Sequence, residues 1–106
     1  DINPVNPGHT LVIPKKHYKN LYETPDEVLA KLMAVVHKLS ISIKESLKAE
    51  GINIMMNNDP AAGQVISHTH IHIVPRFEND GFKHWSGEPY KEGEIEKTAE
   101  KIKINL

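Results

Sequence analysis

Three histidines alternate with other residues between Ser67 and Pro75, and this stretch concentrates the reactive side chains of the chain. They are His68, His70 and His72. Neutral imidazole is a good nucleophile near pH 7 when one ring nitrogen keeps its proton and the other presents a lone pair. Neighbouring imidazoles can bind an oxyanion or pass a proton to a leaving group. The pattern therefore indicates nucleophilic or acid–base chemistry.

A glycine–glutamine step lies just before these histidines and favours a phosphoryl group as the target. Gly63 permits a close approach of the backbone to a ligand, and the amide of Gln64 can hydrogen-bond a phosphate or a bridging oxygen. Three inert, structurally hydrogen-bonded histidines are an alternative, but three in strict alternation are an unusual concentration of polarity.

A metal site is the second alternative. On a strand that rises about 3.3 Å per residue, His68 and His72 lie about 13 Å apart at the backbone, whereas a Zn–N bond is only about 2 Å long. All three histidines cannot bind one ion without a strong bend, so a complete site needs other ligands. In a chain without cysteine the candidates are His9, His17, Asp1 and Asp59.

The alternation itself predicts the element that positions these histidines. Period-2 spacing with β-branched residues is typical of a β-strand, and Pro75 marks its end. Successive side chains of a strand point to opposite faces. We therefore expect the three histidines on one face, and Thr69, Ile71 and Ile73 on the other, packed on a core.

A long helix is predicted over residues 25–49, where apolar residues recur at three- and four-residue spacing. Thr24 is the expected N-cap, Pro25 the first helical residue, and Glu27 can close a capping box. Gly51 is expected to end the helix as the residue after its C-cap.

Short apolar runs at residues 9–13 and 52–56 predict two further strands. The turn-forming loop 57–62 joins the second of them to the histidine strand, which favours an antiparallel pair. A polar, weakly amphipathic helix is predicted over residues 94–103. Together these elements indicate one α+β domain over residues 1–106, with an antiparallel sheet.

The composition limits the classes of partner that the chain is expected to bind. The net charge of −1 gives no electrostatic reason to expect nucleic acid or an anionic membrane as a partner. The chain has no cysteine, no apolar run close to the roughly 20 residues of a membrane span, and no visible signal peptide. We therefore expect a cytoplasmic protein.

The histidine pattern resembles that of the histidine triad (HIT) family, His-φ-His-φ-His-φ-φ with φ usually apolar. Thr69 is a mild departure at a φ position. The residues after the histidines, Val74 to Arg76, resemble the prokaryotic HIT hydrolases. Other matching parts of the chain are Asp1–Pro4, Gly8–His17, Asn57 and Gly63–Gln64.

The resemblance implies an antiparallel sheet of about five strands with one long helix and a short C-terminal helix, dimerised into one continuous sheet. It implies hydrolysis or transfer at the α-phosphorus of an adenosine nucleotide, such as a nucleoside phosphoramidate or a dinucleoside polyphosphate. This chemistry needs no cofactor and no metal. A nucleotide-binding regulatory module with incidental catalysis, or a histidine-based metal protein, are the alternatives.

The resemblance also assigns roles to residues. His70 would attack the α-phosphorus to form a covalent nucleotidyl-histidine, His68 would orient His70, and His72 would contact the phosphate. Gln64 would hold the phosphate or the leaving-group oxygen. The residues expected to bind the purine nucleotide, through its ribose, phosphate or base, are Asp1, Ile2, His9, Asn57, Gly63 and Gln64.

Family members usually have a further strand and helix before the segment that matches Asp1, so we expect elements upstream of this chain to complete the base pocket. Some prokaryotic members carry a Cys-x-x-Cys there, which binds structural zinc with the histidines matching His17 and His68. Because this chain has no cysteine, we predict no zinc in it, and two cysteines upstream would reverse that prediction. From the residues alone, His17 is expected to be a surface residue.

Overall fold

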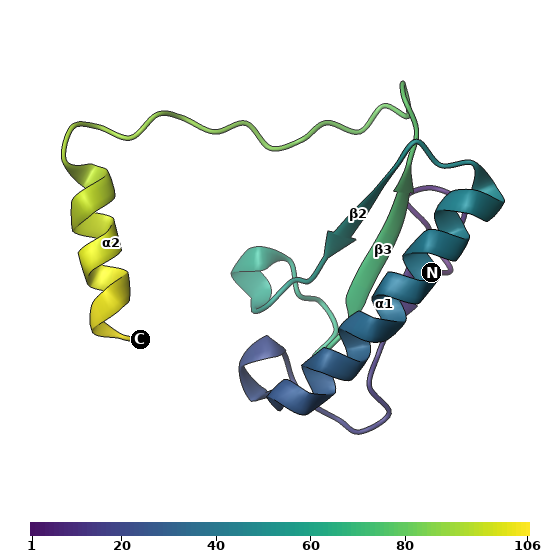
Figure 1. Cartoon of the computed structure of the whole chain (residues 1–106), viewed down its shortest axis with the longest axis horizontal. Coiled ribbons are helices and arrows are strands. Elements are labelled where there is room, and N and C mark those ends of the chain that lie inside the picture. Colours follow the sequence, from purple (N-terminus) through teal and green to yellow (C-terminus); the bar gives the residue numbers. More distant parts are fainter.

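The computed structural model describes residues 1–106. A long helix covers one face of a small antiparallel sheet, and a second helix lies apart from both (Figure 1). The predicted α+β class is confirmed, with three strands in place of about five. No helix has the length and apolar character needed to cross a membrane. The elements are β1 (Thr10–Val12), η1 (Leu21–Glu23), α1 (Asp26–Leu47), β2 (Gly51–Met55), η2 (Pro60–Ala62), β3 (Ile71–Arg76) and α2 (Glu94–Ile104).

The sheet has the order β1-β3-β2, so the histidine-bearing strand is central and both of its neighbours are antiparallel to it. The predicted antiparallel pairing of the last two strands is confirmed. Residues directly opposite one another share a face, and Val12 lies opposite Ile71. Both belong to the core beneath α1. The buried core residues are Val12, Leu32, Val36, Ile71 and Ile73.

His72 projects from the opposite face of the sheet. It lies opposite Leu11 on β1 and Met55 on β2, and its neighbours Ile71 and Ile73 are buried in the core. Because side chains alternate along a strand, the imidazole of His72 points away from α1. This open face of the sheet carries His72.

The histidine strand begins later than predicted. β3 starts at Ile71, opposite the last residue of β1, Val12, and β2 ends at Met55, opposite His72. Residues 68–70 therefore have no neighbouring strand, and the N–H of Thr69 donates instead to the carbonyl of Tyr18 at 2.7 Å. The three histidines do not form one row on one strand, since only His72 belongs to it.

Pro75 does not end the strand, contrary to the prediction. It lies inside β3, opposite Ile52 of β2, and is buried. The pairing with β1 stops two residues earlier, where Thr10 lies opposite Ile73. Proline is tolerated in a sheet where no ladder hydrogen bond is required of its nitrogen, and here β3 has a strand on one side only.

The ends of α1 also differ from the prediction. Pro25 is the N-cap and offers no side-chain hydrogen bond. The hydroxyl of Thr24 donates instead to the carbonyl of Asn20 at 2.7 Å, so the expected capping box is absent. At the other end the C-cap is Lys48, in the left-handed region at φ 54°, because Gly51 already pairs in β2.

The C-terminal part of the chain leaves the sheet as an extended arm that leads to α2 (Figure 1). The predicted helix is confirmed at Glu94–Ile104. It contacts none of the other helices or strands and buries no residue. Its apolar side chains, including Ile95, Ile102 and Ile104, are exposed.

Candidate functional site

His70 is held with one defined nitrogen available. Its Nδ1 lies 2.6 Å from the backbone carbonyl oxygen of His68. A carbonyl oxygen can only accept, so Nδ1 carries the proton and donates. The lone pair of the neutral ring is then on Nε2. This is the state that a nucleophilic imidazole requires, and it arises from the turn that the chain makes before β3.

His72 is part of a directed chain of hydrogen bonds. The N–H of Val5 donates to Nδ1 of His9 at 3.1 Å, so the proton of neutral His9 is on Nε2. That nitrogen lies 2.9 Å from Nδ1 of His72 and donates to it. The remaining proton of neutral His72 is therefore on Nε2. These hydrogen bonds leave the Nε2–H of His72 as an open donor beside His70. The ring centroids of His70 and His72 are 4.9 Å apart.

His68 turns away from the other two histidines and forms a second pair. Its Nε2 donates to the carbonyl of Pro14 at 2.9 Å, which leaves a lone pair on Nδ1. That nitrogen lies 3.2 Å from Nδ1 of His17. His17 is exposed, as expected, yet it is paired. The imidazole of His68 therefore does not touch His70, which is oriented through the backbone of His68 alone.

Burial lowers the pKa of both histidines in the pair formed by His9 and His72. His9 is 6% exposed, and burial lowers its pKa from the ordinary value of 6.5. Burial also lowers the pKa of His72, and the neighbouring His70 and His9 lower it further. Both effects favour neutral rings, the state in which the hydrogen-bond chain runs in one direction only.

The amide of Gln64 makes three hydrogen bonds within the chain. Its oxygen accepts from the N–H of Asp59 at 2.9 Å, and its nitrogen donates to the carbonyls of Lys19 at 2.6 Å and Ile66 at 3.0 Å. These bonds fold the loop between β2 and the histidines against the segment before α1. Gln64 thus shapes the approach to His68, and its contact with a phosphate stays a prediction.

Gly63 and Asn57 meet at the base of that loop. Gly63 has φ 88°, which a side chain would rarely tolerate, and a Cβ there would lie 3.7 Å from Nδ2 of Asn57. Asn57 lies two residues after Met55, which is opposite His72, and its amide makes no hydrogen bond in the chain. The amide is therefore available to a ligand.

Of the first two residues, Asp1 lies close to the histidines and Ile2 is exposed to solvent. A carboxylate oxygen of Asp1 lies 4.0 Å from Nε2 of His9, so Asp1 borders the His9–His72 pair. Ile2 is 94% exposed and packs on nothing. Its contact with a base stays a prediction.

One group of side chains has the spacing of a metal site, and it is not the three histidines. Ligand atoms of Asp1, His9 and His72 lie within 4.8 Å of one another. The hydrogen bonds argue against a metal there, since the Nδ1 lone pair of His9 accepts from Val5 and its Nε2 carries the proton. His17 and His68 fit better, because their two Nδ1 atoms face one another and Nε2 of His17, which has no partner in the chain, can take the ring proton from Nδ1. They would supply two of the four ligands that zinc needs.

An apolar hollow of about 310 Å³ lies beside the histidines. Side chains of β1 and of the segment before His68 form its walls. The residues that line it are Leu11, Ile13, Ile66, His68 and His70. A hollow of this size beside a nucleophile is of the order that small-molecule sites occupy.

Several residues that build the site were not predicted. The carbonyl of Pro14, the N–H of Val5 and the hydroxyl of Thr69 leave no periodic signal in a sequence. Thr69 is 1% exposed and donates to the hydroxyl of Thr24 at 2.8 Å, which ties the turn before β3 to the start of α1. A polar residue at a position where the family pattern expects an apolar one was the only available hint.

The fold and the site define a small α+β protein in which His70, with an open Nε2, lies beside His72. Residues 1–79 match the family model of the HIT domain. The chain belongs to the HIT family.

Two curated relatives carry enzyme names. The chain is 49% identical over 80 residues to the adenylylsulfatase HINT3 of Arabidopsis thaliana, a match that covers 76% of this chain and 41% of the relative. It is 38% identical over 80 residues to the adenosine 5'-monophosphoramidase HNT1 of Candida albicans, covering 72% of this chain and 53% of that one. The chain spans about half the length of these relatives.

Solved structures share the fold. A HIT family protein from Bacillus subtilis is 36% identical, with a TM-score of 0.90 over 100% of this chain and 78% of its own. A zinc-bound histidine triad family protein from Mycobacterium smegmatis is 36% identical, with a TM-score of 0.74 over 100% of this chain and 78% of its own.

Proposed function

We propose that the chain is a hydrolase or transferase acting at the α-phosphorus of a purine nucleotide, through a covalent intermediate on His70. The observation that carries the proposal is the hydrogen bond from Nδ1 of His70 to the carbonyl of His68, which leaves Nε2 as the nucleophile. The enzyme names of two relatives support hydrolysis of adenosine nucleotides with a nitrogen or sulfate leaving group.

The reaction proceeds in two displacements. Nε2 of His70 attacks the α-phosphorus, a P–N bond forms, and the bond to the leaving group breaks with its electron pair. Water then attacks the same phosphorus, the P–N bond breaks, and the nucleoside monophosphate leaves. The protonated Nδ1 shares the positive charge that develops on the ring with the carbonyl of His68.

His72 supplies the donor for the phosphate. Its Nε2–H, fixed by the hydrogen bonds that run from Val5 through His9, faces the region where negative charge grows on phosphoryl oxygen. A preorganised donor of this kind stabilises a transition state more than a mobile one does, because it requires no reorganisation during the reaction.

The other nucleotide contacts surround this pair of histidines. Asn57, with its unused amide, is proposed to contact ribose or phosphate, and Asp1 to accept from the ribose hydroxyls. Gln64 is proposed to contact the leaving-group side, exchanging one of its backbone hydrogen bonds for the substrate. The apolar hollow beside His70 adds a surface on which an uncharged part of the substrate can pack.

We also propose that residues 1–106 form one HIT domain that works as a homodimer. β2 is an edge strand, and its Ile54 and Met55 are each 42% exposed. The exposed Met33 and Ile41, two turns apart, share a face of α1. Pairing two β2 edges would cover the free strand edges and extend the sheet. Light scattering in solution tests this assembly.

The arm supports the same assembly. α2 contacts no other helix or strand of its own chain, and the Bacillus subtilis protein superimposes over 100% of this chain with a TM-score of 0.90. An amphipathic helix held away from its own body has an apolar face that a second subunit can cover. A regulatory binding module remains the alternative function, distinguished by tight nucleotide binding without turnover.

The test is the mass of the intact protein after brief acid quench from a mixture with adenosine phosphoramidate. We expect a mass increase of one adenylyl group in the wild type and none in His70→Ala, together with loss of nucleoside monophosphate release. His37→Ala is a matched control, since His37 is an exposed histidine on α1. An unchanged turnover in His70→Ala contradicts the proposal.

A further inference from the structure

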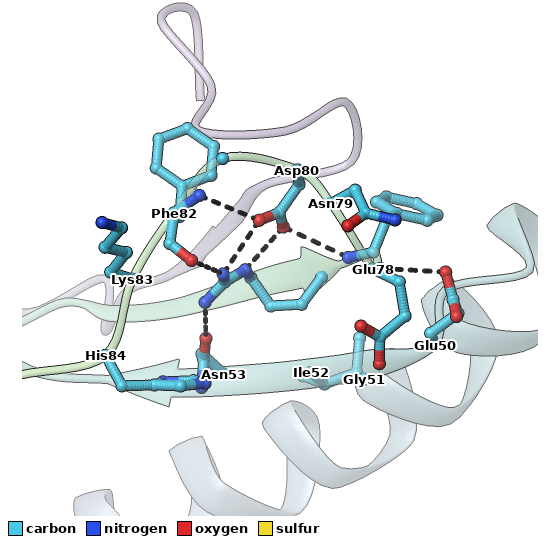
Figure 2. A pocket seen from close by; sticks show the side chains of 13 residues that line it. Glu50, Gly51, Ile52, Asn53, Glu78, Asn79, Asp80, Phe82, Lys83 and His84 are labelled. Carbon is cyan, nitrogen blue, oxygen red and sulfur yellow. Dashed lines mark hydrogen bonds and ion pairs between the residues drawn. The ribbon is translucent and has the colours of Figure 1, made fainter.

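An ion pair fixes the turn that follows β3 (Figure 2). Nε of Arg76 donates to one carboxylate oxygen of Asp80 at 2.7 Å, and an Nη atom donates to the other at 3.0 Å. The same carboxylate accepts from the N–H groups of Phe77 and Phe82. The side chain of Asp80 is only 7% exposed. A turn with this many charge-assisted hydrogen bonds is a rigid anchor.

Asn6 ties the N-terminal segment to this anchor. The two N–H groups of its amide donate to the carboxylate of Asp80 at 3.0 Å and to the carbonyl of Pro75 at 2.9 Å. The backbone carbonyl of Asn6 accepts from the N–H of His9 at 3.0 Å. Asn6 thus connects the end of β3, the following turn and the backbone of His9.

The turn that Asn6 anchors is the one that decides the tautomer of His9. Within residues 5–9, the N–H of Val5 meets Nδ1 of His9 and leaves the proton on Nε2, facing His72. Gly8 has φ 95° and lies so close to Leu47 that a side chain there would clash. Glycine at this position therefore lets the segment pass close to Leu47, while Asn6 holds its other end to the turn after β3.

We propose that Asn6 and Asp80 are positioning residues that act through His9 on His72. They hold Val5 in donating position, so that His9 donates and does not accept, and His72 keeps its Nε2–H for the substrate. The catalytic significance of this inference rests on the proposed function. Neither side chain hydrogen-bonds a histidine ring, and nothing in the sequence pattern links positions 74 residues apart.

The test compares Asn6→Ala with the wild type by nitrogen-15 spectra of the imidazole rings at neutral pH. In the wild type we expect His9 and His72 both as the Nε2–H tautomer. In Asn6→Ala we expect both rings as mixtures of tautomers, and a fall in kcat of about fivefold to tenfold with little change in KM. His37 supplies the internal reference, because it is exposed on α1.

Glu50→Ala is the matched control. Glu50 accepts from the N–H of Glu78 at 3.0 Å, so its removal loosens the same turn without touching Asn6. Unchanged tautomers in Asn6→Ala, or equal changes in Glu50→Ala, would overturn the inference. Should Asn6→Ala not fold, Asn6→Ser serves for the same comparison. The spectra need no turnover, so an inactive wild type would refute the proposed function while the spectra still decide the positioning.

Discussion

Two histidine pairs stand side by side in this protein and differ in what surrounds them. Each pair has ring centroids 5.1 Å apart, and the facing nitrogens are 2.9 Å apart in His9–His72 and 3.2 Å apart in His17–His68. The first pair lies against the sheet with a buried His9, whereas the second ends in an exposed His17. The rings are alike, but their surroundings give them different chemistry.

The difference lies at the nitrogens that face away from the partner. In the first pair, Val5 donates to His9, which fixes the direction of every hydrogen bond up to His72. In the second pair, the carbonyl of Pro14 accepts from His68, so the direction is also fixed but is opposite, with Nδ1 of His17 donating to Nδ1 of His68. The open nitrogen of the first pair, Nε2 of His72, therefore carries a proton, whereas the open nitrogen of the second pair, Nε2 of His17, carries a lone pair. The first pair can donate to an anion, and the second can bind a cation.

The largest expected effect comes from removing one histidine of each pair. Because His72 presents a fixed donor to the phosphate, we expect His72→Ala to lower kcat by about 100-fold, within the range of a single acid–base group. His17→Ala should lower it by less than about threefold, since His70 is oriented by the backbone of His68. Steady-state hydrolysis of adenosine phosphoramidate measures both.

Equal losses in the two variants would contradict the contrast, because they would show that the exposed pair is as closely coupled to the reaction as the buried one. Unfolding temperatures of both variants are the control, since a variant that is partly unfolded at the assay temperature would lose activity for another reason.

A second, smaller difference should appear in the dependence of stability on pH. Burial lowers the pKa of His9 and His72 from 6.5 in the folded protein. Below pH 6.5 the unfolded chain therefore binds protons that the folded chain does not. The free energy of unfolding should fall as the pH decreases from 6.5 towards the lowered values, and be fully regained above 6.5.

Urea unfolding between about pH 7.5 and about pH 5.5 measures this slope. We expect a shallower slope in His72→Gln and an unchanged slope in His17→Gln. Asp80 does not interfere, because Arg76 holds its pKa below the ordinary value of 3.8 and its contribution is lost only in stronger acid. The same slope in all three proteins would show that burial of the first pair has no energetic consequence.

Periodicity predicted the elements well and their ends poorly. The apolar spacing of α1, the short strands and the helix at residues 94–104 were recognisable because side-chain period follows secondary structure directly. The capping box at Thr24 was wrong because the helix begins one residue later, with Pro25 as the N-cap, and the hydroxyl of Thr24 is directed to the carbonyl of Asn20. The predicted start of β3 was wrong because alternation is a property of a single segment, whereas a β-strand also needs a neighbouring strand with which to pair.

The histidines were predicted as residues, and their arrangement was not. A sequence shows that His9, His17, His68, His70 and His72 exist, and spacing suggests which could meet. It cannot show which nitrogen carries the proton, because that depends on backbone groups such as the N–H of Val5 and the carbonyls of Pro14 and His68. Backbone N–H and carbonyl groups occur along every chain, and only the fold determines which of them meets an imidazole.

The smallest expected effect is a difference in affinity for zinc. Two imidazole ligands of a tetrahedral zinc lie about 3.3 Å apart, close to the 3.2 Å between the Nδ1 atoms of His17 and His68. His17 can move its proton to Nε2 by giving up only its hydrogen bond to His68, which a shared zinc would replace, whereas Nδ1 of His9 is already engaged by Val5. We expect zinc to perturb the ring resonances of His17 and His68, to leave those of His9 unchanged, and to be removed by EDTA.

At a zinc concentration several times the dissociation constant, zinc should stabilise the fold by about 1 kcal/mol, and His17→Ala should abolish that gain. Perturbation of His9 and His72 first would show that the buried pair is the more open of the two.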